Sequence, residues 1–138
     1  MLSQSQGKII LTSSGAAVNA SVAWGAYGAS KAVLNHLAST LAIEEPEIIT
    51  IALRPGTVDT EMQRELREIH HTTMDKKDVA KFASLKSDGK LLQPDQPGHV
   101  IAKLALDAPK TLSGKFLRLA LNFERDKWER ANPPLQLE

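Results

Sequence analysis

The chain has 138 residues, 42% of them apolar and 24% charged, with a formal net charge of +1. This composition is typical of one globular domain and excludes a disordered chain. The small net charge favours neither nucleic acid nor an anionic membrane as a partner, and no apolar run approaches the ~20 residues of a membrane-spanning helix. The sequence has no cysteine, which excludes disulfides and thiolate metal sites, and we expect a cytoplasmic protein.

The first half of the chain alternates between strand and helix patterns. Residues 8–13, KIILTS, form a short apolar run that predicts a buried strand. Residues 27–43 have helical spacing, and Pro46 ends that segment. Residues 48–53 are continuously apolar and rich in β-branched residues, which is typical of a strand covered on both faces. The apolar stripe of the helix consists of Val33, Leu37 and Leu41.

The second half is predicted to hold three helices and one more strand. Thr60 begins the motif TEMQ, a capping box with Thr60 as N-cap and Gln63 at the third helical position. A short helix is expected at about residues 78–85, and Asp95 is expected to cap another that ends before Pro109. The segment KFLRLAL after an SG turn predicts the last strand. The apolar stripe of the first of these helices consists of Met62, Leu66 and Ile69.

This order of elements indicates an α/β fold with a parallel sheet and βαβ crossovers. We assign residues 1–121 to one domain and leave the charged tail, residues 122–138, unassigned. Because three strands are few for such a sheet, the strand at residues 8–13 is expected to have an exposed hydrogen-bonding edge.

Three residues of the segment SSGAAVNASVAWGAYGASK, namely Ser14, Tyr27 and Lys31, suggest a proton-transfer site. Residues four apart on a helix share a face, so Tyr27 and Lys31 are neighbours. A free tyrosine keeps its proton until about pH 10, but a nearby cation and the positive end of a helix dipole both stabilise the phenolate. Tyr27 can then exchange a proton with a carbonyl oxygen, and Ser14, at the tip of the preceding strand, can hydrogen-bond the same oxygen.

Structural explanations of these and other residues stay open at this point. A Tyr–Lys pair four apart is a weak motif by itself, and Ser13 suits a turn at the strand end as well as Ser14 does. Trp24 either lines a pocket or packs the loop. His70 and His71 are adjacent, so on a helix they point about 100° apart, and no carboxylate is suitably spaced to make a metal site with them.

From about Gly7 to Arg118 the chain resembles the short-chain dehydrogenase/reductase family. The family's Y-x-x-x-K motif appears as Tyr27 and Lys31 inside YGASKA, and its PG turn appears inside RPGTVDT. The family serine lies thirteen residues before the tyrosine, which selects Ser14 over Ser13. The sequences of these motifs most resemble those of fungal carbonyl reductases of the sepiapterin- or benzil-reductase type. The resemblance implies the last three strands of a Rossmann-like, doubly wound parallel sheet.

The resemblance also implies a function and a role for each site residue. The reaction would be NAD(P)H-dependent reduction of a small carbonyl compound, or the reverse oxidation of an alcohol, with NADP favoured over NAD. Tyr27 would be the general acid/base, Lys31 would support it and hold the nicotinamide ribose, and Ser14 would orient the carbonyl. Without the resemblance, Thr60 is a plain helix cap and RPG a plain turn. The implied cofactor-binding residues are Tyr27, Lys31, Pro55, Gly56, Val58 and Thr60.

One family element is missing from these 138 residues. No two glycines lie two positions apart, so there is no G-x-G loop to receive the cofactor diphosphate. Residues 1–121 therefore correspond to the catalytic and nicotinamide side of a family member, and we expect a fragment or a chain inactive alone. The alternative is a non-catalytic, truncated family member that acts as an interaction module. The helix at residues 27–43, which in the family commonly packs against its twin, would then form a homo-oligomer.

Overall fold

A computed structural model describes residues 7–119, which form a three-stranded parallel sheet in the order β1-β2-β3. The strands are β1 (Lys8–Thr12), β2 (Ile49–Arg54) and β3 (Phe116–Arg118), each within one to three residues of the predicted ends. The predicted α/β fold is confirmed, and the tail at residues 122–138 lies outside the described residues. Paired residues in the register include Ile10 with Ile51, Leu11 with Ala52, and Ala52 with Phe116.

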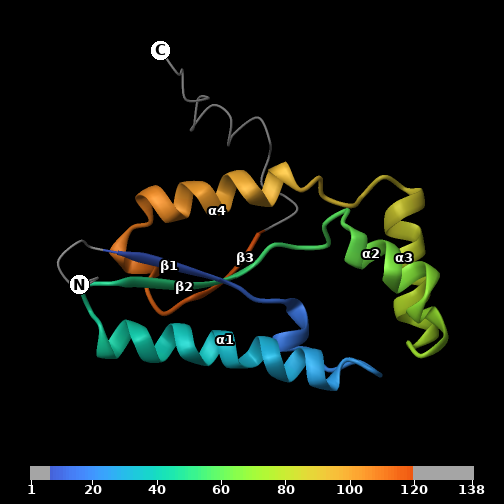
Figure 1. Ribbon diagram of the computed structural model, residues 1–138, viewed down its shortest axis with the longest axis horizontal. Coiled ribbons are helices and arrows are strands. Elements are labelled where there is room, and N and C mark those ends of the chain that lie inside the picture. The colour runs from blue at the N-terminus through green and yellow to red at the C-terminus, as the bar shows by residue number, and fades with distance from the viewer. Residues whose placement is uncertain (1–6, 120–138) are drawn as a thin grey trace, which may run out of the picture.

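Two long helices cover the opposite faces of this sheet. Figure 1 shows α1 (Gly25–Glu44) on one face and α4 (Asp95–Asp107) on the other. The middle strand β2 is therefore the core of the molecule, as its continuous apolar sequence predicted. β1 pairs only with β2 within the described residues, so its second edge is unpaired, and its first four residues are half-buried while Thr12 is exposed. The most buried residues are Ala38, Thr50, Ile51, Ala52 and Leu53.

The apolar stripe expected on α1 is not the face that meets the rest of the fold. Val33 is 63% exposed and Leu37 is 39% exposed, whereas the buried positions of α1 are Gly28 and Ala38. Small residues on the inner face let the helix backbone approach the sheet and the loop after β1. Val33 and Leu37 of the predicted stripe are left toward solvent, whereas Leu41, its third residue, is half-buried.

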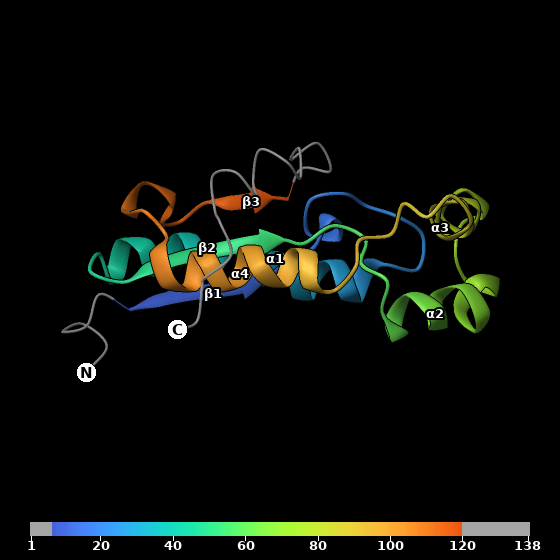
Figure 2. The ribbon, with the colours of Figure 1, turned by 90° about the horizontal axis from the view of Figure 1, so that it is seen from above.

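The helices α2 (Glu61–Glu68) and α3 (Lys76–Ser87) lie beyond the carboxyl ends of the strands, as Figure 2 shows from above. Both ends of this excursion are joined by backbone hydrogen bonds. The Asp59 N–H donates to the Leu92 carbonyl at 2.8 Å, and the Leu92 N–H donates to the Thr57 carbonyl at 2.9 Å. The excursion therefore leaves and rejoins the body at one place, next to the end of β2.

Two predicted helix caps are wrong in detail. Thr60 is the N-cap residue of α2, but its hydroxyl donates to the Val58 carbonyl at 3.4 Å and caps no helix N–H. Gln63 is buried, and its side-chain oxygen makes no reciprocal capping bond, since it has no hydrogen-bond partner among residues 7–119. Asp95 is the first residue of α4, and Pro94 occupies the cap position.

Within residues 7–119, no helix is long and apolar enough to span a membrane.

Candidate functional site

A cavity of about 490 Å³ lies at the carboxyl ends of β1 and β2, between the first turns of α1 and the α2–α3 excursion. In parallel sheets this edge is where ligands bind. The structure brings all the predicted site residues to this one cavity, although they come from three separate segments. The predicted residues that line it are Ser14, Tyr27, Lys31, Pro55, Gly56, Val58 and Thr60.

The two serines after β1 have different partners. Ser13 is 3% exposed, and its hydroxyl lies 2.7 Å from the Asn35 amide oxygen, to which it donates. The Ser14 hydroxyl accepts a hydrogen bond from the Ala16 N–H at 3.2 Å, because Ser14 is the N-cap of a short 3₁₀ turn (Gly15–Ala17). Among the described residues the Ser14 hydroxyl has no acceptor, so its hydrogen is available to a ligand in the cavity.

Tyr27 and Lys31 lie together in the first two turns of α1. The Lys31 ammonium is 5.8 Å from the centre of the Tyr27 ring and donates to the Thr12 carbonyl at 3.0 Å, at the end of β1. This hydrogen bond uses one of the three ammonium donors and holds the ammonium beside the end of β1, and Lys31 also lines the cavity. No hydrogen bond joins the Tyr27 hydroxyl to any residue between 7 and 119, so the phenol is also available to a ligand.

The PG turn forms another wall of the cavity at the end of β2. Gly56 has a φ of +92°, in the left-handed region, and a Cβ there would lie 2.9 Å from Cδ1 of Leu92. The left-handed conformation favours glycine at this position, and the missing side chain lets Leu92 pack against the turn. The backbone then passes Val58 and reaches α2 through Thr60, which places both residues on the cavity wall.

Aromatic residues form a further wall of the cavity, and sequence reasoning found only part of it. The ring centres of Trp24 and Tyr27 are 5.5 Å apart in an edge-to-face arrangement, and those of Trp24 and Phe82 are 6.1 Å apart. Trp24 therefore lines the cavity, which decides between its two predicted roles. Phe82 was missed because it lies on α3, whose position over the site is a tertiary contact. Met62 and Leu66, two residues of the predicted α2 stripe, also line the cavity.

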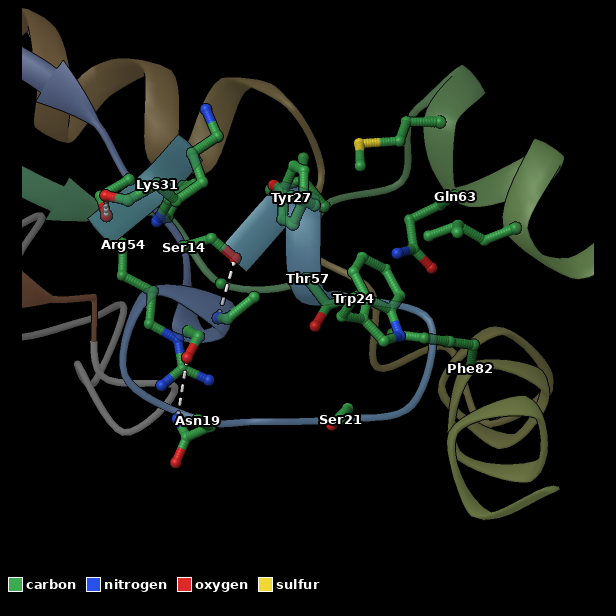
Figure 3. Close-up of a pocket in the computed structure, with 18 of the residues that line it drawn as sticks. Ser14, Asn19, Ser21, Trp24, Tyr27, Lys31, Arg54, Thr57, Gln63 and Phe82 are labelled. Carbon is green, nitrogen blue, oxygen red and sulfur yellow. Dashed lines mark hydrogen bonds between the residues drawn. The ribbon is translucent and has the colours of Figure 1, made fainter. Parts of the chain in front are cut away.

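Arg54 and Gln63 are two further polar lining residues that sequence reasoning missed as site residues. The Arg54 guanidinium lies against Gly15, where a Cβ would come within 2.5 Å of its Cζ atom. Gly15 is thus required for this contact, a signal visible only in the structure. Figure 3 shows Arg54 and Ser14 at one end of the cavity, with Trp24, Gln63 and Phe82 at the other.

A family model described as short chain dehydrogenase matches residues 1–70 of the chain. This match covers β1, the turn with Ser14, all of α1 with Tyr27 and Lys31, and β2. The chain belongs to the short-chain dehydrogenase/reductase family. The recognition made from YGASKA and RPGTVDT is therefore confirmed, and with it membership of an oxidoreductase family.

Individual relatives agree with this family. A benzil reductase ((S)-benzoin forming) of Saccharomyces cerevisiae is 41% identical over 116 residues, which cover 81% of this chain and 44% of that protein. The sepiapterin reductase of Rattus norvegicus is 39% identical over 69 residues, which cover 50% of this chain and 25% of that protein. A crystal structure of a short-chain dehydrogenase/reductase from Saccharomyces cerevisiae has a TM-score of 0.82 at 41% identity and covers 88% of this chain and 48% of that one. This short-chain dehydrogenase/reductase chain thus spans less than half the length of these relatives.

Proposed function

We propose that the cavity is the catalytic and nicotinamide side of an NAD(P)H-dependent carbonyl reductase. The observation that carries this proposal is the convergence of Ser14, Tyr27 and Lys31 on one cavity, with hydrogen-bond donors of all three available there. The relatives support the same class of reaction, since they include a benzil reductase and a sepiapterin reductase.

In this mechanism the protein positions a carbonyl oxygen and supplies its proton. The Ser14 hydroxyl donates a hydrogen bond to the oxygen, and the Tyr27 hydroxyl transfers its proton to the same atom. The ammonium of Lys31, held by the Thr12 carbonyl, stabilises the phenolate that remains. In the reverse direction the phenolate accepts the proton of an alcohol.

The residues of the cavity fit one end of a nicotinamide cofactor, which supplies the hydride when bound. Within residues 7–119 the Lys31 ammonium donates only to Thr12, which leaves two donors for ribose hydroxyls, and the left-handed turn at Gly56 has no side chain to block an approaching ring. Val58 and Thr60 would hold the carboxamide. The 138 residues contain no binding site of the family type for the diphosphate of the cofactor, because they lack a G-x-G loop. We therefore expect weak binding of NADPH and NADH by this chain alone, with NADPH preferred.

The test is turnover of benzil with NADPH and with NADH. The assay uses the 138-residue chain and a chimera in which the chain replaces the matching part of the yeast benzil reductase, so that the rest of that protein is present. Tyr27→Phe removes the proton donor and should lower kcat of the chimera by about 10²- to 10⁴-fold. Ser30→Ala is the matched control on the same helix, since that exposed hydroxyl only bonds the Tyr27 carbonyl. If Tyr27→Phe left turnover unchanged, Tyr27 would not be the proton donor and the proposed mechanism would be refuted.

Self-association is a second candidate function, supported by the exposed apolar side chains of α1. Val33 is 63%, Leu37 is 39% and Ile43 is 81% exposed. A second copy packed on this face would cover them. Sedimentation velocity should then show a dimer that Val33→Glu dissociates, whereas Leu106→Glu on α4, also at an exposed apolar residue, leaves it intact. A monomer at all concentrations would exclude this role.

A further inference from the structure

Arg54 carries a positive charge that the described part of the fold does not pair. The residue is half-buried at the end of β2 and lines the cavity. Among residues 7–119 its guanidinium forms no ion pair and no hydrogen bond, whereas the Lys31 ammonium donates to the Thr12 carbonyl. Charged side chains that leave water are normally paired, because the loss of hydration is unfavourable. The Arg54 guanidinium is therefore a candidate for ligand binding.

Gly15 keeps open the space in which this guanidinium lies. A Cβ on Gly15 would come within 2.5 Å of Cζ, 2.6 Å of Nη2 and 2.8 Å of Nε of Arg54. Because Gly15 directly follows Ser14 in the chain, the guanidinium lies beside the residue whose hydroxyl is proposed to bind the carbonyl oxygen. Figure 3 shows the side chains of Arg54 and Ser14 at the same end of the cavity.

The charges that line the cavity favour an anion at this end. Within residues 7–119, the charged lining residues are Lys31, Arg54, Asp78 and Lys81. Asp78 and Lys81 both belong to α3, which forms the opposite end of the cavity in Figure 3. The end that holds Ser14 is thus lined by two cations and by no carboxylate of the described residues.

The shape of the guanidinium defines the anion that it recognises. Its planar fork of N–H donors matches the two oxygens of a carboxylate, and these charge-assisted hydrogen bonds are stronger than bonds to a neutral oxygen. The position beside Ser14 places such a carboxylate a few bonds from the reacting carbonyl. A phosphate group fits the same fork, so the cofactor is a second possible source of the anion.

We propose that Arg54 binds a carboxylate of the substrate, next to the carbonyl group that Ser14 and Tyr27 hold. The inference rests on the proposed function for the identity of the reacting carbonyl. It adds the substrate class, namely oxo acids whose carboxylate lies a few bonds from the carbonyl. An aromatic remainder of such an acid can pack against Trp24 and Phe82 at the other end of the cavity.

Binding to the 138-residue chain tests this inference without any turnover. Isothermal titration compares phenylglyoxylate and 3-benzoylpropanoate with their primary amides, which keep the shape of each acid and lose its charge. At least one acid should bind about five- to tenfold more tightly than its amide, an effect between that of an exposed ion pair and that of a buried charged hydrogen bond. Arg54→Met, which keeps an unbranched side chain and removes the charge, should abolish this difference.

Two controls separate recognition from general electrostatics and from stability. Lys103→Met removes a positive charge from an exposed residue of α4 outside the cavity, and it should keep the full preference for the acid. The Tm of Arg54→Met should match that of the parent chain, because the guanidinium has no ion pair or hydrogen bond within residues 7–119. If that variant does not fold, Arg54→Lys, which keeps the charge without the fork, should reduce the preference.

The chimera with the yeast benzil reductase distinguishes the substrate from the cofactor as the source of the anion. Fluorescence titration with NADPH should give the same Kd for the chimera and for its Arg54→Met variant. If the substitution instead weakens the binding of NADPH and leaves the difference between acid and amide unchanged, Arg54 binds a cofactor phosphate and the proposal is overturned.

The remaining outcomes separate this inference from the proposed function. Tyr27→Phe should retain the preference for the acid, so a chain that shows the preference but no turnover in the chimera refutes the reductase mechanism alone. Equal binding of both acids and their amides, with benzil still reduced by the chimera, overturns the role of Arg54 alone. A preference that persists in Arg54→Met, or a large fall in the Tm of that variant, overturns it as well.

Discussion

Gly28 and Gly25 are two glycines of α1 whose substitution by alanine should have opposite effects on stability. A Cβ at Gly28 would lie 2.7 Å from the carbonyl oxygen of Ala16, in the 3₁₀ turn that follows Ser14. A Cβ at Gly25 would meet nothing within 4 Å. Gly28 thus allows the helix that carries Tyr27 to pack against the turn that carries Ser14.

The size of the effect follows from this geometry. The Cβ at Gly28 would be about 0.7 Å closer than the 3.4 Å at which ordinary contact begins, and the atom it meets is backbone, which cannot rotate away. Overpacking of this kind costs about 1–3 kcal/mol, and the better helix propensity of alanine returns up to about 1 kcal/mol. Gly25→Ala gains the propensity without the clash. The free energies of unfolding of the two variants should therefore differ by about 1–3 kcal/mol.

Urea unfolding followed by circular dichroism measures this difference, with Gly98→Ala on α4 as a second glycine that has open space around it. In the chimera, Gly28→Ala should also lower kcat for benzil, because a shifted helix changes the distance between the Tyr27 and Ser14 hydroxyls. Variants of Gly28 and Gly25 that agree within about 0.5 kcal/mol would refute the close-packing argument, since this is the usual scatter of surface substitutions.

Three further predictions concern the core and α2. Leu53→Ala should lower the free energy of unfolding by about 2–5 kcal/mol, since Leu53 is 2% exposed, whereas Leu106→Ala at a 72% exposed residue should change it by less than about 0.5 kcal/mol. Thr60→Ala should lower the free energy of unfolding by less than the ~0.5–2 kcal/mol that loss of a capping side chain costs, because the Thr60 hydroxyl bonds no helix N–H. A decrease within that range would show that Thr60 caps α2 after all. The hydrogen bond from Arg64 lowers the pKa of Glu61 below its ordinary value of 4.5. The stability that this pair adds is therefore fully present above pH 4.5, and it is lost as the pH falls through the lowered pKa of Glu61. Hydrogen exchange of α2 amides should show this acid loss of protection, and Glu61→Gln should remove it.

The site was predictable where chain neighbours decide it. Tyr27 and Lys31 lie one helical turn apart, and the helix pattern alone placed them on one face. The family spacing selected Ser14, and the structure shows the Ser13 hydroxyl committed to Asn35 instead. Trp24 stayed ambiguous in the sequence, because its partner Phe82 is far away along the chain.

The errors arose where one pattern fits two environments. An apolar stripe marks a face that avoids water, but it does not say what covers it, and Val33 and Leu37 turned out to face outward. The TEMQ motif of α2 satisfied the capping-box pattern, yet the Thr60 hydroxyl bonds the Val58 carbonyl, and the buried side-chain oxygen of Gln63 has no partner among residues 7–119. Local preferences of this kind are worth about 1 kcal/mol, which tertiary packing easily overrides.

By itself the sequence determined the parallel α/β fold, the family and the Tyr27–Lys31 pair, because strand and helix periods and short motifs depend on residues close in the chain. Only the tertiary structure decided which face of α1 is covered, where α3 lies, and which polar groups line the cavity without partners. Those properties depend on contacts between distant segments: Phe82 meets Trp24, and the Gln63 amide lines the same cavity as the Tyr27 phenol.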